Sequence, residues 1–290
     1  MKLICYIIIA LLMISLVGCG PQSNAEIACT TLPVYEFTVR LCHGTDIRVV
    51  RLVTENVSCL HDYTLQTRQM QAIESAQLIV INGAGLEEFL EDALHGAANV
   101  VDCSYGLHLE EGHHHEHDHD GGHVHAEDPH IWLSPENAKV MAHNIFRSLT
   151  KQYPSYRDQF LKNLEALFTD LDALQTYGEM KLKDLSCREI ITFHDGFTYL
   201  AESFDLHILR AIEEESGSEA SAAELIELIS LVREHQIPAI FTEANGSVSA
   251  AGVISAETYI PVYALDMAMS GDSYFDSMYR NIDVLWEALQ

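Results

Sequence analysis

The sequence has 290 residues, 48% of them hydrophobic and 20% charged, which is enough for two domains of ordinary size. It carries 43 acidic side chains against 16 basic ones, and its formal net charge is −27. This excess of negative charge argues against nucleic acid as a partner and favours a cationic ligand.

The chain begins with a basic residue, Lys2, and an apolar stretch over residues 3–17 that is too short to span a membrane comfortably. Leu16-Val17-Gly18-Cys19 follows and resembles a bacterial lipobox. We therefore predict a signal peptide over residues 1–18, lipidation of Cys19 and a tether over residues 19–26. The alternative is an uncleaved anchor. Both place the protein outside the cytoplasm, attached to a membrane at the cell surface or in the periplasm.

The first half of the mature chain alternates short apolar runs with helical stretches. Alternating strands and helices indicate a mostly parallel sheet covered by helices. We predict strands at residues 27–32, 47–53, 78–82 and 100–101, and helices at residues 64–75 and 86–94.

The second half repeats the same alternation, and a long amphipathic helix separates the two halves. Apolar residues recur every three or four positions from Tyr156 to Leu174, without an internal proline. The predicted class is α/β, with two α/β lobes of mostly parallel strands joined by a long rigid α-helix and a metal site between the lobes. A stiff connector predicts only small rearrangements on ligand binding. The lobes are predicted at 27–154 and 186–290, the linking helix at 155–185, strands at 189–193, 206–212, 239–242 and 262–265, and further helices at 197–204 and 220–234.

A tract rich in histidine and carboxylates, residues 112–126, lies inside the first lobe. Imidazole suits borderline divalent ions such as zinc, and the interleaved acids add negative charge. We predict metal contact, against the alternatives of a solvated polar loop or an expression tag. The candidate accessory ligands are His113, His114, His115, His117, His119, His123 and His125.

An odd number of cysteines, five, remains once Cys5 is removed with the signal and Cys19 is lipidated. At least one of these five thiols is therefore free, and the other four leave room for one or two disulfides. Cys187 stands alone in the second half and is expected to be a buried filler. The others lack Cys-x-x-Cys spacing, which argues against a thiolate zinc site; they are Cys29, Cys42, Cys59 and Cys103.

Four chemically active side chains stand at or just after predicted strands, where open α/β sheets form their ligand sites. They are His61, His130, His194 and Asp266. Three imidazoles and a carboxylate, two from each lobe, match a four-coordinate zinc site between the lobes. Singly, each histidine has the plainer interpretation of a hydrogen-bonded structural residue.

Two further features surround these candidates. Ser134 can cap the helix that follows His130, with Pro135 at its first position. Asp128 and Asp195, each close in sequence to a predicted ligand, are placed to orient the rings.

Over nearly the whole mature chain, the sequence resembles the zinc-binding receptors of bacterial ABC importers, within the transition-metal solute-binding lipoproteins. The segments that carry the resemblance are the one around His61, Asp-Pro-His-Ile-Trp-Leu-Ser-Pro at 128–135, Phe-His-Asp-Gly-Phe-Thr-Tyr-Leu-Ala at 193–201, Phe-Thr-Glu-Ala-Asn at 241–245 and Leu-Asp at 265–266.

The resemblance implies a receptor that binds Zn²⁺ and delivers it to a permease driven by ATPase subunits, as a monomer and without catalysing a reaction. It maps His61, His130 and His194 onto the metal-binding histidines and Asp266 onto the acidic position at the metal. It also implies that the His-rich tract captures or senses excess zinc.

Metal choice depends on the third histidine, because manganese-selective relatives carry a carboxylate where this chain has His194. Nitrogen-rich tetrahedral sites suit zinc, whereas manganese prefers oxygen ligands. The chain departs from its relatives at Ser58-Cys59-Leu60-His61, which lacks their proline, so Cys59 could compete as a ligand. Water could also replace Asp266 in the shell.

Three alternatives stay open. One is a manganese receptor of the same family, and another is a metal-buffering surface adhesin whose tract is the principal binder. The third is a zinc hydrolase, which needs an open metal position and a general base. The sequence contains no His-Glu-x-x-His motif for that activity.

Overall fold

The computed structural model describes residues 25–55, 60, 63–95, 97, 99–110, 127–212, 221–244 and 248–290. Two four-stranded sheets, all of whose strand pairs are parallel, form the framework. The predicted α/β class with two parallel-stranded lobes is confirmed. Among the described helices, none combines the length and the apolar character needed to cross a membrane.

The N-terminal lobe comprises the elements from β1 to α5. Its strand order is β2-β1-β3-β4. The chain adds β2 on one side of β1 and then crosses to the other side for β3 and β4, so the strand order reverses between β1 and β3. Its elements are β1 Ile27–Cys29, α2 Leu32–Leu41, β2 Val49–Arg51, α3 Thr67–Ser75, β3 Leu78–Ile81, the 3₁₀ turn η1 Glu88–Leu90, α4 Glu91–Leu94, β4 Val100–Asp102, the 3₁₀ turn η2 Ile131–Leu133 and α5 Pro135–Gln152.

The C-terminal lobe comprises the elements from β5 to α10. Its strand order, β6-β5-β7-β8, has the same pattern as that of the first lobe, with the reversal between β5 and β7. Its elements are β5 Glu189–Thr192, α7 Thr198–Ser203, β6 His207–Ala211, α8 Ala222–His235, β7 Ile240–Glu243, α9 Ser249–Thr258, β8 Val262–Leu265 and α10 Tyr274–Leu289.

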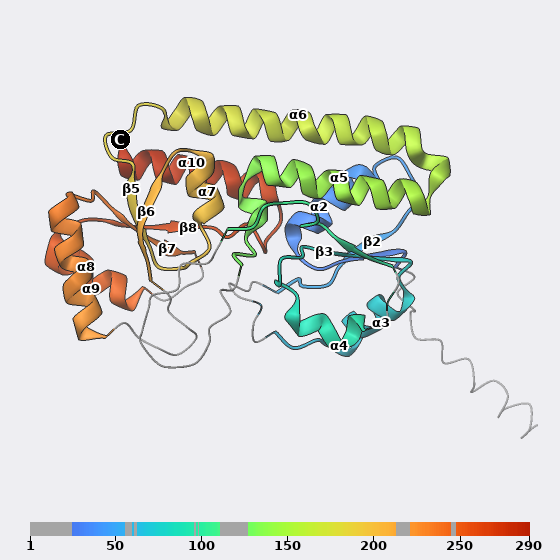
Figure 1. Ribbon diagram of the computed structural model, residues 1–290, viewed down its shortest axis with the longest axis horizontal. Coiled ribbons are helices and arrows are strands. Elements are labelled where there is room, and N and C mark those ends of the chain that lie inside the picture. Colours follow the sequence, from blue (N-terminus) through green and yellow to red (C-terminus); the bar gives the residue numbers. More distant parts are fainter. Residues whose placement is uncertain are drawn as a thin grey trace, which may run out of the picture.

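The lobes are joined by the 3₁₀ turn η3, Pro154–Tyr156, and the 26-residue helix α6, Arg157–Leu182. Figure 1 shows α6 running along one side of both lobes. It packs against α5 and α2 of the first lobe and against α10 of the second. The predicted apolar stripe is confirmed, since its leucines from Leu164 to Leu174 are buried at that spacing.

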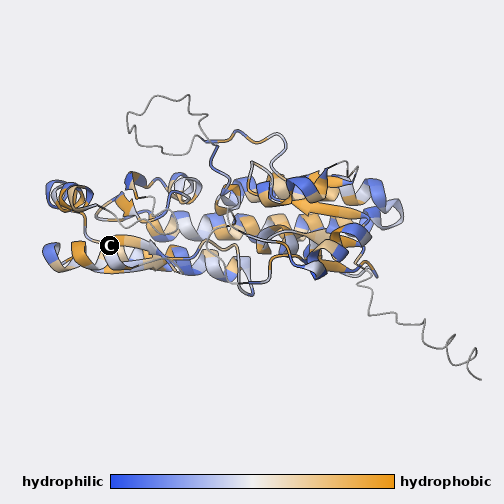
Figure 2. Cartoon of the chain, turned by 90° about the horizontal axis from the view of Figure 1, so that it is seen from below, coloured by the Kyte–Doolittle hydropathy of each residue, from blue (hydrophilic) through white to orange (hydrophobic). Residues whose placement is uncertain are grey.

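One hydrophobic core runs through both lobes. The same cluster of buried side chains includes Val80 in the first sheet, Leu167 on α6 and Phe241 in the second sheet. In Figure 2 the hydrophobic colour follows the strands and one side of the helices. Since the lobes share packed side chains, separating them would expose apolar surface, which favours a stiff molecule.

Several predicted boundaries were wrong, for local reasons. The first strand ends at Cys29 instead of residue 32, because Leu32 already begins α2 with a proline in its first turn. Helix 64–75 begins only at Thr67, after a capping box formed by Gln66 and Gln69. The helices α2, α9 and α10 had not been predicted.

The predicted cap of α5 is confirmed: the Ser134 hydroxyl accepts a hydrogen bond from the Asn137 N–H, and Pro135 begins the helix. Four cysteines, Cys29, Cys42, Cys103 and Cys187, are free. Cys187 is half-buried instead of buried. Burial raises the pKa of the Cys42 thiol to about 12, so this thiol stays protonated and is a poor metal ligand.

The contact between α6 and the second lobe depends on Gly178. A Cβ at this position would lie 2.1 Å from a ring carbon of Phe204. Replacing Gly178 with Ala is therefore expected to destabilise the protein by about 1–3 kcal/mol through overpacking. Gly252→Ala is the matched control, since a Cβ there meets nothing within 4 Å in a helix. It should stabilise by about 0.5–1 kcal/mol. Urea unfolding of both variants makes the comparison, and equal effects would contradict this view of the contact.

Candidate metal centre

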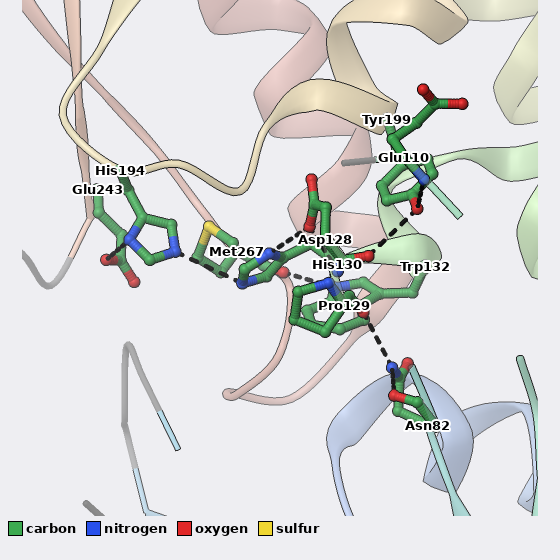
Figure 3. A network of polar contacts seen from close by, with 11 residues as sticks. Asn82, Glu110, Asp128, Pro129, His130, Trp132, His194, Tyr199, Glu243 and Met267 are labelled. Carbon is green, nitrogen blue, oxygen red and sulfur yellow. Dashed lines mark hydrogen bonds and ion pairs between the residues drawn. The ribbon is translucent and has the colours of Figure 1, made fainter. Parts of the chain in front are cut away.

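Side chains from other elements hold the segment that carries His130, by donating hydrogen bonds to its main-chain carbonyls. The Asn82 side chain at the end of β3 donates to the Pro129 carbonyl at 2.9 Å. The Tyr199 hydroxyl on α7 donates to the Asp128 carbonyl at 3.1 Å, and the Tyr274 hydroxyl on α10 donates to that of Trp132 at 2.8 Å. Buried carbonyls need such partners. The result is a segment fixed by both lobes (Figure 3).

Asp128 sets the orientation of the His130 ring. Its Oδ1 accepts the His130 backbone N–H at 2.9 Å and lies 2.7 Å from the ring Nδ1. A carboxylate acceptor at this nitrogen favours the tautomer with the proton on Nδ1, which leaves a lone pair on Nε2. Both residues are buried. Asp128, two residues before His130, thus sets the direction of the His130 Nε2 lone pair.

His194 meets His130 from the other lobe. It follows β5, and its Nε2 lies 3.4 Å from the Nε2 of His130, with the rings edge to face. Gly196 makes this approach feasible, because a Cβ there would lie 2.8 Å from Nδ1 and Cε1 of the His130 ring. The structure therefore brings together two of the four predicted ligands, each through the same ring nitrogen.

Glu243 is a residue of the site that the sequence prediction missed. It ends β7, the neighbour of β5, and its Oε2 lies 3.9 Å from the Nδ1 of His194. Burial, with the nearby charge of Asp266, raises the pKa of this carboxyl to about 7. The signal was available, since Glu243 stands at the carboxyl end of a strand next to the reversal point of the sheet.

Asp266 follows β8 and is held firmly. Its Oδ1 accepts the Ala268 N–H at 2.8 Å, and its Oδ2 accepts the Ser277 hydroxyl at 2.9 Å. Asn281 bonds both its backbone groups, at 2.8 and 2.7 Å. Arg280 lies 3.6 Å from Oδ2. The carboxylate is fixed in place, and its role as a ligand stays a prediction.

Glu87 supports the site from the first lobe. Its carboxylate accepts hydrogen bonds from the Thr30 hydroxyl and from the N–H groups of Asn82 and Gly83, at 2.6, 2.7 and 3.0 Å. Burial raises its pKa to about 7. These bonds hold the turn after β3, and with it the Asn82 side chain that contacts the Pro129 carbonyl.

Other predicted site residues lie outside the described part of the chain. They are His61, Cys59, Cys19 and the accessory histidines His113, His114, His115, His117, His119, His123 and His125. Within the described part, no group of three or more His, Cys, Asp or Glu side chains is arranged to hold a metal ion. A complete shell around His130 and His194 therefore requires a further ligand, for which His61 is the sequence candidate.

The raised pKa of Glu243 has a consequence for stability. In the folded state this group binds a proton up to about pH 7, whereas its ordinary value is 4.5, so its contribution to stability is lost as pH rises through that window. Glu243→Gln cannot titrate, and its stability relative to wild type should therefore grow between pH 5 and 8, by at most about 3 kcal/mol. Urea unfolding of the metal-free proteins measures this difference.

Glu234→Gln is the control, because Glu234 is exposed on α8. It should show no such growth. A stability difference between Glu243→Gln and wild type that stays constant with pH would contradict the assigned cause.

Comparison with known proteins identifies relatives along most of the chain. A high-affinity zinc uptake system protein, ZnuA, of Bacillus subtilis is 29% identical over 308 residues, covering 97% of this chain and 96% of the relative. The zinc-binding lipoprotein AdcA of Streptococcus pneumoniae (strain TIGR4) is 29% identical over 305 residues, which is 98% of this chain but only 60% of that longer protein.

Solved structures share the fold. A crystal structure of ZnuA has a TM-score of 0.80 at 28% identity and covers 92% of this chain and all of its own. The Zn(II)-bound ZnuA-like domain of the pneumococcal AdcA has a TM-score of 0.76 at 25% identity, with 91% of this chain and 98% of that domain covered. The family model described as zinc-uptake complex component A, periplasmic, matches residues 27–288, and the chain belongs to this family.

Proposed function

We propose that the protein is the extracytoplasmic receptor of a zinc importer of the ABC type. It captures Zn²⁺ and delivers it to a permease served by ATPase subunits, and it catalyses no reaction. The family, described as a periplasmic zinc-uptake component, supports this function. So do the names of relatives matched along most of this chain.

The observation that carries the proposal is the spacing of the two imidazoles. Two nitrogens bound to one tetrahedral zinc at about 2.0–2.1 Å lie about 3.3–3.4 Å apart. The Nε2 atoms of His130 and His194 are 3.4 Å apart. Zinc between them would replace the contact of the two ring nitrogens with two coordinate bonds, once neither nitrogen carries a proton. In this proposal His61 and Asp266 complete the shell, with water as the alternative to Asp266.

The architecture suits such a receptor. In our proposal the first lobe extends over residues 27–154 and the second over 186–290, and each contributes two ligands. The shared core and α6 limit the motion between lobes, so the metal enters a largely preformed site. The protein is anchored through Cys19, works as a monomer, and presents the His-rich tract as an accessory binder.

Removing either imidazole tests the assignment. His130→Ala and His194→Ala are each expected to weaken zinc binding by more than the roughly 10–100-fold that outer-shell changes cause. Competition with a chromophoric chelator measures the affinity. His143→Ala on α5 is the matched control, because His143 is exposed, and it should bind zinc as wild type does. Wild-type affinity in either ligand variant, with the fold intact by urea unfolding, would overturn the proposed site.

A further inference from the structure

The hydroxyl of Tyr199 forms two hydrogen bonds beside the candidate metal centre. It donates to the Asp128 carbonyl at 3.1 Å and accepts the Glu110 N–H at 3.0 Å. The residue is buried, and burial raises the pKa of the phenol to about 12, so the hydroxyl keeps its proton. Figure 3 shows the hydroxyl between its two partners. Both bonds join α7 of the second lobe to main chain of the first.

The two partners of the hydroxyl are also paired with each other. The Asp128 N–H donates to the Glu110 carbonyl at 2.8 Å. Glu110 and Asp128 stand on either side of residues 111–127 in the sequence, which include the His-rich tract. Residues 111–126 lie outside the described part of the chain, and Tyr199 from the other lobe therefore bonds a described residue on each side of them.

Asp128 links this contact to the metal pair, because the same residue holds the Nδ1 and the backbone N–H of His130. Tyr199 in turn lies five residues after His194, on the helix that follows it. Besides its contacts to Trp132, the second lobe thus meets His130 through the His194 ring and Asp128 through the Tyr199 hydroxyl. A displacement of Asp128 would rotate or shift the His130 ring relative to His194.

Other contacts hold the segment without this relation. Asn82 bonds the Pro129 carbonyl from within the first lobe, and Tyr274 bonds the Trp132 carbonyl beyond His130. Neither contacts the main chain of Asp128, and neither lies on the helix that directly follows His194. Tyr199 is therefore distinguished because it contacts Asp128, which holds the His130 ring, from the helix that follows His194.

We propose that Tyr199 is a positioning residue of the zinc site, which sets the separation and orientation of His130 relative to His194 by holding Asp128. This inference rests on the proposed function. In this proposal the Tyr199 hydroxyl does not touch the metal, yet it fixes the relative geometry of His130 and His194, which come from opposite lobes. The same hydroxyl bonds Glu110 and Asp128, described residues on either side of residues 111–126 in the sequence.

Tyr199→Phe removes the hydroxyl and keeps the ring in the core cluster to which Tyr199 belongs. A cavity of about 350 Å³, lined by Tyr199, Glu110 and Glu202 among others, borders the phenol. Water from this cavity can solvate the freed carbonyl and N–H, so the variant should fold while its metal site loosens.

The experiment compares the full chain in detergent as wild type, Tyr199→Phe and Tyr153→Phe. Tyr153 is the matched control, since its buried hydroxyl has no hydrogen-bond partner in the described structure. Zinc affinity is measured by chelator competition, ligand geometry by the visible spectrum of bound Co²⁺, and stability by urea unfolding without metal. We expect Tyr199→Phe to bind zinc at least about 10-fold more weakly with an altered Co²⁺ spectrum. Tyr153→Phe should match wild type in both.

A double-mutant cycle with Asp128→Asn separates positioning from general stability. If Tyr199 acts through Asp128, Tyr199→Phe should have little further effect on zinc affinity in the Asp128→Asn background. Additive losses would overturn the inference, as would lowered stability with unchanged affinity and spectrum. Should Tyr199→Phe not fold, Asp128→Asn alone carries the test, and unchanged zinc affinity in it overturns the inference.

Failure of the proposed function can be distinguished from failure of the inference. It fails if wild type binds zinc weakly, or if His130→Ala leaves the Co²⁺ spectrum unchanged, and both proposals then fall together. Tight zinc binding that depends on His130 but is indifferent to Tyr199 and Asp128 would overturn only the inference.

Discussion

The geometry of the candidate site depends on the hydrogen bond between Asp128 and the His130 ring. Imidazole has two nitrogens, and a ring that is free to rotate or to exchange tautomers offers a metal no defined lone pair. With Asp128 on Nδ1 at 2.7 Å, the other nitrogen faces His194 at 3.4 Å. Because Asp128 is buried and bonded through its main chain, the direction of that lone pair is set by the fold before metal arrives.

This preorganisation depends on the stiff packing of the two lobes against each other and against α6. The continuous core and the helix α6 hold the two sheets in fixed relative positions. Asn82 after β3 and His194 after β5 then reach the His130 segment from the two lobes. Burying carboxyls near the meeting point is costly, as the raised pKa values of Glu87 and Glu243 indicate. A bound cation would favour the ionised form of Glu243, so metal binding and the loss of the Glu243 proton should accompany each other.

Sequence reasoning succeeded where the signal was periodic or compositional. The parallel strands and the linking helix followed from apolar runs and a three-to-four-residue repeat. His194 follows a strand as predicted, whereas His130 precedes the turn η2 and lies far in sequence from the strand before it, β4. Sequence reasoning failed where tertiary contacts decide the outcome. Leu32 begins a helix directly after a three-residue strand, and Glu243 acquires its role only because β7 lies beside β5. The supporting bonds of Tyr199 join residues 71 and 89 positions apart, which no local pattern reveals.

The central claim is that the metal binds between His130 and His194 and not at the His-rich tract. It is tested most directly by a competitive Zn²⁺ titration of the protein lacking residues 113–125, with Mn²⁺ measured in parallel. The account predicts that one tight zinc site survives the deletion and that manganese binds much more weakly. Loss of tight zinc binding would place the site in the tract, and equal manganese affinity would contradict a zinc-selective pair of imidazoles.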